Sequence, residues 1–268
     1  MNKFERIEAI LILGALACAG VIVYLLFATP ARSEGWPLDA MNTQIEETNV
    51  IVNGVCSGTI ISKEQRLVLT AYHCVDALFQ EVTEKIVDPK TGEIKEHTIQ
   101  KIVPLKIITN KLRNFEIIAT EDHTATVVGS DSSADIALIQ VIDKDYTPLS
   151  AAALAPETYS YKRGLHVFAV GNPAITFDNS ITEGIISAPQ RMLDIDGRHL
   201  KVFQFSAGII GGNSGGSVLN DQGEMIGTVS AAIRGSAISF AVPISYTKEM
   251  IVRAGFGGIL PRPREPSH

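Results

Sequence analysis

The stretch Gly211-Gly212-Asn213-Ser214-Gly215-Gly216 is a glycine-rich turn with one serine inside it, and it leads directly into the β-type run 216–219. Acyl transfer requires a hydroxyl held outside regular structure with backbone N–H groups beside it, and glycine permits the necessary positive φ angles and close backbone approach. Gly, Asn and Ser are also ordinary turn residues. The stretch can therefore be either a loop that carries a nucleophile at Ser214 or an ordinary surface loop. The presence of a base and its orienting acid elsewhere in the chain decides between these two interpretations.

Short runs rich in β-branched and apolar residues, separated by turn signals, fill the chain from Val50 onward. Asp88-Pro89-Lys90-Thr91-Gly92-Glu93 predicts a hairpin turn. Helical patterning is confined to a short turn after His73, extending as far as Lys85, and to residues 244–254. Many short strands with few helices predict an all-β antiparallel barrel or sandwich, and a division near residues 148–156 suits two barrels joined by a linker. The runs are 50–52, 58–61, 67–70, 99–108, 124–128 and 136–142, and then 165–170, 181–187, 201–205, 216–219, 225–230 and 238–242.

The N-terminal residues 1–33 differ from the rest because residues 9–28 carry no charge, a length that can span a bilayer as a helix. We predict an uncleaved signal anchor with its N-terminus in the cytoplasm, and a cleaved signal peptide is the alternative. In both cases the chain from Glu34 onward faces the outside. Residues 34–48 are predicted to be a linker, and the proline-rich residues 256–268 a flexible tail.

The amino-acid composition bears on which binding partners to expect and on whether the protein lies in an oxidising compartment. The chain has 268 residues, 46% of them hydrophobic, a net charge of −6 and no Lys/Arg cluster, which disfavours nucleic-acid binding. Of its three cysteines, Cys18 lies in the membrane segment, which leaves Cys56 and Cys74 in the exported part. An oxidising compartment lets these two form a disulfide, and two buried free thiols are the alternative.

His73 and Asp135 are the candidates for a base and its orienting acid. His73 follows the apolar run 67–70 and precedes Cys74, so a strand end and a disulfide at Cys74 would fix it in space as a general base requires. Asp135 precedes the apolar run 136–141, where a buried carboxylate needs a partner, and a histidine N–H would satisfy it. The residues with weaker surroundings are Asp131, Asp143, His97, His123, His166, His199 and His268.

The order His73, Asp135, Ser214, together with the flanking segments, resembles the trypsin-like serine proteases of the chymotrypsin fold and, more narrowly, their HtrA-type branch. The matching segments cover most of residues 50–245 in the family's order. They are Cys56-Ser57-Gly58-Thr59-Ile60-Ile61, Val127-Val128-Gly129-Ser130-Asp131, Asp135-Ile136-Ala137-Leu138, Val170-Gly171-Asn172-Pro173, Thr182-Glu183-Gly184-Ile185-Ile186-Ser187-Ala188, the Ser214 loop and Ile238-Ser239-Phe240-Ala241-Val242-Pro243.

The resemblance implies two antiparallel six-stranded β-barrels in a protease domain over residues 49–255, divided near 148–158. It implies that Ser214 is the nucleophile, His73 the base and Asp135 the orienting acid, with an oxyanion hole built from the backbone at Gly212, Asn213 and Ser214. No metal and no organic cofactor is expected.

Several positions are interpreted by matching them to the family's pattern. Asn213 stands where digestive enzymes carry the aspartate that pairs with a new N-terminus, so we expect activity without zymogen cleavage. Gly208 lies at the base of the specificity pocket, which favours a small or medium aliphatic residue before the scissile bond. Ser230, Ala231 and Ala232 are expected to bind the substrate backbone as an edge strand.

The leading hypothesis is a membrane-tethered serine endopeptidase that acts outside the cytoplasm, in the periplasm or extracellular space, on exported or misfolded proteins. If the N-terminal segment is cleaved, the enzyme is secreted. A binding or chaperone-like module on a protease fold, and a self-processing or single-target protease, are the alternatives. HtrA-type proteins usually continue into a PDZ domain, but this chain ends soon after Pro243, so PDZ-based docking is not expected and the oligomeric state stays open.

Overall fold

The computed structural model describes residues 36–87, 94–113, 116–195 and 197–260. The chain divides into two compact units, Met1–Pro37 and Leu38–His268, and the fold below is that of the second unit. The predicted membrane segment 1–33 lies outside the described residues. Within the described part of the chain, no helix is long and apolar enough to cross a membrane.

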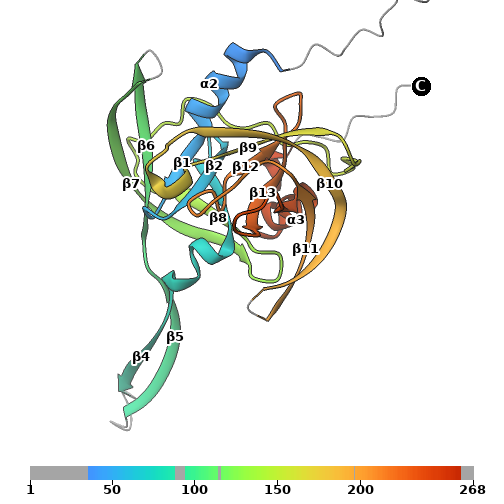
Figure 1. Cartoon of the computed structure of the whole chain (residues 1–268). Helices are drawn as coiled ribbons and strands as arrows, with labels where there is room; N and C mark the ends of the chain where they lie inside the picture. The colour runs from blue at the N-terminus through green and yellow to red at the C-terminus, as the bar shows by residue number, and fades with distance from the viewer. Residues whose placement is uncertain (1–35, 88–93, 114–115, 196, 261–268) are drawn as a thin grey trace, which may run out of the picture. The chain divides into compact units, whose positions relative to one another are not determined.

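Six antiparallel strands close the first barrel in the order β1-β2-β3-β8-β7-β6 (Figure 1). Buried residues such as Val52, Ile107 and Ile139 fill its interior, which explains why short β-branched runs form these strands. The strands are β1 (Asn49–Val52), β2 (Cys56–Ser62), β3 (Leu67–Thr70), β6 (Leu105–Arg113), β7 (Glu116–Asp131) and β8 (Ile136–Val141).

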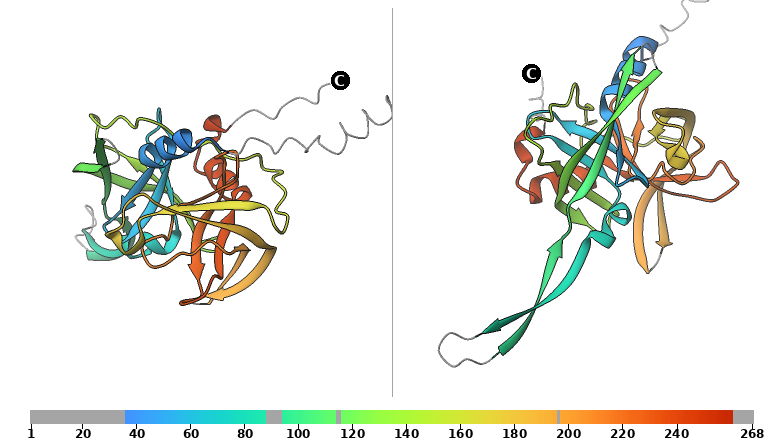
Figure 2. Two further views of the ribbon diagram at one scale, coloured as in Figure 1. Left: turned by 45° about the horizontal axis from the view of Figure 1, so that its top comes forward. Right: turned by 90° about the vertical axis from the view of Figure 1, so that its left-hand side faces the viewer.

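Six further antiparallel strands close the second barrel in the order β10-β11-β14-β13-β12-β9. Its core contains Phe203, Phe205 and Val218, all fully buried. The strands are β9 (His166–Gly171), β10 (Ser180–Ile195), β11 (Arg198–Phe205), β12 (Ser217–Leu219), β13 (Met225–Ala232) and β14 (Ser239–Pro243). The two closed barrels confirm the all-β, two-barrel prediction, and they lie side by side in both views of Figure 2.

The charge-rich segment between the two halves of the first barrel was predicted only in part. Strands β4 (Phe79–Val87) and β5 (Ile94–Ile102) pair as a separate two-stranded ribbon that extends beyond the barrel (Figures 1 and 2). The expected helix up to Lys85 is wrong, because only the short 3₁₀ turns η1 (Tyr72–Cys74) and η2 (Asp76–Leu78) precede β4. The predicted single strand 99–108 is divided after Ile102, before Pro104, which has no N–H to donate to a ladder. The predicted turn 88–93 lies outside the described residues.

Helices are few, as predicted, but one replaces most of the expected linker 34–48. Helix α2 (Leu38–Thr48) buries Ile45 and Thr48, and Gln44 Nε2 donates to the Gly223 carbonyl 2.8 Å away in the second barrel. These contacts fix a segment whose polar composition alone indicates a tether. Helix α3 (Ile244–Arg253) follows β14 as expected, and the turns η3 (Pro173–Ile175) and η4 (Gly257–Ile259) are the remaining helical elements of the described residues, η4 within the expected tail.

The second barrel depends on its aromatic core, so we predict that Phe203→Ala lowers the free energy of unfolding by about 3–5 kcal/mol. Phe203 is 0% exposed, and its ring packs 4.8 Å from that of Tyr161, centroid to centroid. Phe177→Ala is the matched control, because Phe177 is 62% exposed and its loss is expected to change stability by no more than about 0.5 kcal/mol. Urea denaturation of both variants measures the difference, and equal losses would contradict this account of the core.

Candidate active site

His73 lies at the point where the buried strand β3 ends and the turn η1 begins. The prediction that Cys56 and Cys74 form a disulfide is confirmed, with their Cα atoms 6.0 Å apart, and the bond ties η1 to β2. This cross-link lies next to His73 in the chain and restricts the backbone that carries the imidazole. Cys56, His73 and Cys74 form a group of possible metal ligands by distance, but the disulfide removes the thiolates that would bind a metal.

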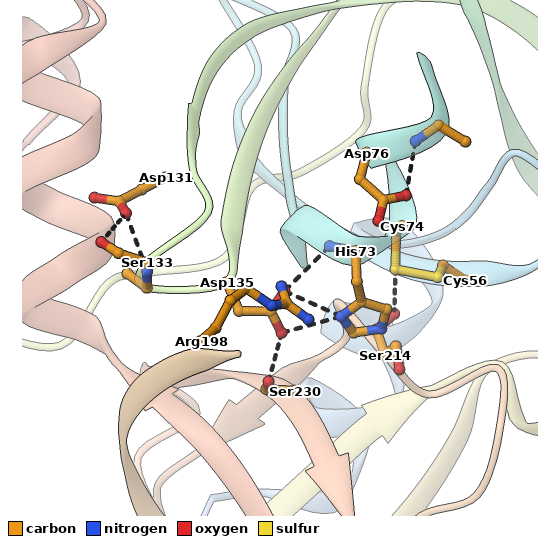
Figure 3. A network of polar contacts seen from close by, with 12 residues as sticks. Cys56, His73, Cys74, Asp76, Asp131, Ser133, Asp135, Arg198, Ser214 and Ser230 are labelled. Carbon is orange, nitrogen blue, oxygen red and sulfur yellow. Dashed lines mark hydrogen bonds and ion pairs between the residues drawn. A yellow bond between two sulfur atoms is a disulfide. The ribbon is translucent and has the colours of Figure 1, made fainter. Parts of the chain in front are cut away.

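Asp135 is 1% exposed and directly precedes β8. The His73 ring nitrogen Nδ1 lies 3.1 Å and 3.0 Å from Oδ1 and Oδ2 of Asp135, and the His73 backbone N–H donates to Oδ1 at 3.1 Å. Ser230 Oγ donates to Oδ2 at 2.5 Å, and Arg198 Nη1 donates to Oδ1 at 3.1 Å (Figure 3). Donors therefore surround the carboxylate from both barrels.

The protonation of Asp135 follows from these contacts. Burial by itself raises the pKa of this carboxyl group, but the hydrogen bonds from His73 and Ser230 and the charge of His73 together hold its pKa below the usual 3.8. The group is therefore an anion at neutral pH. An anionic partner favours the His73 tautomer that carries its proton on Nδ1 and leaves Nε2 free to accept one.

Figure 3 draws Ser214 near the His73 ring, on the loop that leads into β12, and the Ser214 carbonyl oxygen lies 3.8 Å from Sγ of Cys74, the residue after His73. Among the described residues, no hydrogen bond joins Ser214 Oγ to His73 Nε2, a bond that often forms only when substrate binds. Gly215, with φ +83°, places its Cα where a Cβ would collide with Thr70 Oγ1 and the Ser57 carbonyl. The glycines therefore allow the serine loop of the second barrel to approach the first barrel closely.

Of the three residues predicted for the oxyanion hole, the structure leaves two as available donors. The Asn213 N–H closes a turn by donating to the Ile210 carbonyl at 3.1 Å, so Asn213 cannot contribute as predicted. Within the part of the chain that the structure describes, no backbone acceptor is found for the N–H of Gly212 or of Ser214. Gly212 has φ +100°, as the third residue of a type II turn requires.

The residues predicted to bind substrate have different surroundings. Ser230 is buried and uses its hydroxyl on Asp135, at a bulge between β13 and β14. Ala231 is half-buried and Ala232 exposed at the end of β13, as an edge for a substrate backbone must be. A Cβ added to Gly208 would meet nothing within 4 Å, so open space lies beside the predicted pocket base.

The rival residues that the structure describes have other polar partners. Asp131 binds Ser133 and Arg253, and Asp143 accepts from the Thr124 N–H. His123, His166 and His199 contact Thr109, Glu183 and Asp194 respectively. The side chains of His97 and His268 lie outside the described residues.

Two groups of residues at this site are not indicated by the sequence patterns. Arg198 reaches Asp135 from the start of β11, and no local pattern indicates that a residue of this hairpin contacts a residue of the first barrel. Ser57 and Asn172 lie in segments that carry the family resemblance, but their roles follow only from the contacts described below.

A family model for the trypsin-like peptidase domain matches residues 56–227. The chain is also similar to a serine protease HtrA-like of Staphylococcus haemolyticus, with 34% identity over 155 residues, 53% of this chain and 24% of the relative. Serine protease Do-like HtrB of Bacillus subtilis is 30% identical over 151 residues, 53% of this chain and 32% of the relative. Mitochondrial serine protease HTRA2 of Drosophila grimshawi is 35% identical over 154 residues, which are 55% of this chain and 35% of the relative.

These matches confirm the resemblance to trypsin-like and HtrA-type proteases that the sequence indicates. The chain spans only between 24% and 35% of the length of these three relatives. The similarity therefore concerns one domain, and the family model covers the segments that contain His73, Asp135 and Ser214.

We predict that Asp135→Asn removes a pH-dependent part of the stability. The folded pKa of Asp135 is lowered, so its stabilisation is complete above the unfolded pKa, near 4, and is lost as the pH falls through the still lower folded value. The difference in free energy of unfolding between wild type and Asp135→Asn should therefore be largest above about pH 5 and shrink below about pH 4. Denaturant unfolding at several pH values measures it.

The matched control is Glu64→Gln on the exposed turn between β2 and β3. It is expected to follow wild type within about 0.5 kcal/mol at each pH. A gap between wild type and Asp135→Asn that stays constant down to pH 2 would argue against an anionic, stabilised carboxylate.

Proposed function

The chain belongs to the trypsin-like peptidase family, and from this premise we propose that it is a serine endopeptidase whose triad is Ser214, His73 and Asp135. The pair between His73 Nδ1 and Asp135, 3.0 Å apart and next to Ser214, is the observation that carries the proposal. The two carboxylate oxygens hold the imidazole in one orientation, with Nε2 on the serine side. This is the arrangement that a nucleophile and its general base need.

In the first half of the reaction, His73 Nε2 accepts the proton of Ser214 as Oγ attacks the peptide carbonyl carbon. Asp135 stabilises the imidazolium without taking the proton itself. The negative oxygen of the tetrahedral intermediate is bound by the N–H groups of Gly212 and Ser214. The C–N bond then breaks, and His73 gives its proton to the leaving amine.

In the second half, a water molecule attacks the acyl-enzyme while His73 takes one of its protons. The C–O bond to Ser214 breaks, the serine recovers its proton from His73, and the carboxylic acid product leaves. In this mechanism the side chains of Ser214, His73 and Asp135 and the backbone N–H groups supply every catalytic group.

We further propose that the site works without zymogen cleavage. Asn213 carries an amide and cannot form an ion pair with a new N-terminus. The turn that orients the Gly212 N–H is already closed by the bond from Asn213 N–H to Ile210. Ile51 and Val52, which imitate an activated N-terminus in sequence, are buried residues of β1.

The substrates that we propose are exported or misfolded proteins, cleaved after small or medium aliphatic residues. The exposed end of β13 offers an edge to an extended chain, and Gly208 places neither a side chain nor a charge at the expected base of the pocket, which supports an aliphatic preference. The relatives named above are serine proteases, which favours this function over the alternative of a chaperone-like module. Attachment to the outer face of a membrane through residues 1–33, or secretion after cleavage, belongs to the same proposal.

We predict that a fluorophosphonate probe labels wild type and fails to label Ser214→Ala. Because the alanine removes the nucleophile, peptide hydrolysis should fall by at least about 10³-fold. Ser150→Ala, in the connection between the barrels, is the control that should keep both labelling and hydrolysis. An unlabelled wild type of native stability would favour the chaperone-like alternative.

We predict that Gly208→Asp shifts cleavage toward peptides with Lys or Arg before the scissile bond. The new carboxylate would enter open space and pair with the basic side chain. Gly208→Asn has nearly the same shape without the charge and should not produce the shift. The ratio of kcat/KM for basic and aliphatic peptides is the measurement, and a wild type that already prefers basic residues would overturn the pocket assignment.

A further inference from the structure

The turn of residues 210–213, called the oxyanion turn below because it presents the Gly212 N–H, is hydrogen-bonded to a buried serine of the other barrel. Ser57 lies on β2 and is 0% exposed, and its Oγ lies 2.7 Å from the carbonyl oxygen of Gly212. The same Oγ lies 2.8 Å from the backbone N of Asn172 and 3.2 Å from Asn172 Nδ2. Both groups of Asn172 can only donate, so the single proton of the Ser57 hydroxyl must go to Gly212.

Asn172 is itself fixed by a network of amides. Its Nδ2 donates to the Val50 carbonyl at 3.0 Å, and its Oδ1 accepts from Asn49 Nδ2 at 2.8 Å and from the Asn179 N–H at 3.1 Å. Asn172 is 0% exposed, and Asn49 is also buried. The hydroxyl of Ser57 therefore connects a rigid support to the loop that carries Ser214.

The contacts around Gly212 determine where its N–H points. Because C=O and N–H point in opposite directions across a trans peptide, holding the Gly211 carbonyl aims the Gly212 N–H the other way. The Gly211 carbonyl accepts a hydrogen bond from the N–H of Ala174 at 2.7 Å, and Ala174 lies two residues after Asn172 in the chain. The next peptide is held on both sides, by Ser57 on the Gly212 carbonyl and by Ile210 on the Asn213 N–H.

Gly212 also has no room for another residue. A Cβ there would collide with the Asn172 carbonyl and come within 2.8 Å of the Ala174 nitrogen. Ser57 thus acts on the turn twice, directly through the Gly212 carbonyl and indirectly through the position of Asn172 and Ala174.

We propose that Ser57 is a positioning residue for the oxyanion hole, which it serves by fixing the peptides on both sides of Gly212 while touching neither substrate nor Ser214 Oγ. This inference rests on the proposed peptidase function. The network joins the first barrel to the second at the backbone that binds the developing negative charge. The transition state should therefore depend on Ser57 more than substrate binding does.

The test compares Ser57→Ala with wild type by kcat per active site, counted with a fluorophosphonate titration, and by KM. We expect kcat per titrated site to fall about 10- to 100-fold, somewhat less than the loss of a whole oxyanion donor, with KM changed less than about twofold. A peptide aldehyde, which forms a tetrahedral adduct, should bind more weakly in proportion to the loss in kcat/KM. Ser62→Ala removes another buried hydroxyl of β2, which accepts from the Gln65 N–H, and should leave all three values unchanged.

Asn172→Asp provides an independent variant if Ser57→Ala does not fold. Its new carboxylate oxygen, in place of Nδ2, would attract the Ser57 proton away from Gly212, so kcat per site should again fall. Unchanged kcat per site in a folded variant of either kind overturns the role of Ser57. A wild type that hydrolyses no peptide and is not labelled at Ser214 instead overturns the proposed function, and this inference with it.

Discussion

The site depends on the seam between the barrels, where β2 of the first barrel contacts the Ser214 loop of the second. The Ser57 N–H donates to the Ser214 carbonyl at 2.8 Å, and Thr70 Oγ1 donates to the Ser57 carbonyl at 2.8 Å. Gly215 and Gly216 lie so close to their neighbours that a Cβ on either would collide with backbone atoms. His73 and Asp135 come from one barrel and Ser214 from the other, so the proposed triad exists only while this contact holds.

The same seam supplies part of the electrostatic stabilisation of the buried Asp135 carboxylate. An unpaired carboxylate at the depth of Asp135 would be strongly unfavourable. It is stabilised by His73 from the first barrel and by Ser230 and Arg198 from the second. Each barrel therefore contributes donors to one buried charge, and separating the barrels would remove the Ser230 and Arg198 donors from that charge. Docking of the barrels and ionisation of Asp135 stabilise each other.

Sequence patterns were sufficient where the information is local. The β-branched runs predicted most strands, and the positions of His73 and Asp135 beside strand ends identified the pair that the structure brings together. The patterns failed where tertiary contacts decide. Burial of Ile45 fixes helix α2 where a linker was expected, and residues 79–85 pair within the ribbon of β4 and β5 where a helical extension was expected. Arg198 reaches Asp135 only because a hairpin of the second barrel lies against the first.

The contacts at the seam also offer a way in which the oxyanion turn could be ordered without zymogen cleavage. Asn213 and Ser57 Oγ both lie against Gly171, where a Cβ would come within 3.0 Å of the hydroxyl. The turn that presents Gly212 is therefore held by buried amides and one hydroxyl, none of which titrates near neutral pH. An ion pair with a newly formed N-terminus depends on chain cleavage and on the charge of an amine, whereas these contacts form as the barrels dock. The ordering of the oxyanion turn should then accompany folding itself, and under the proposed function the polar network behind Gly212 takes the place of the activation step in the digestive enzymes.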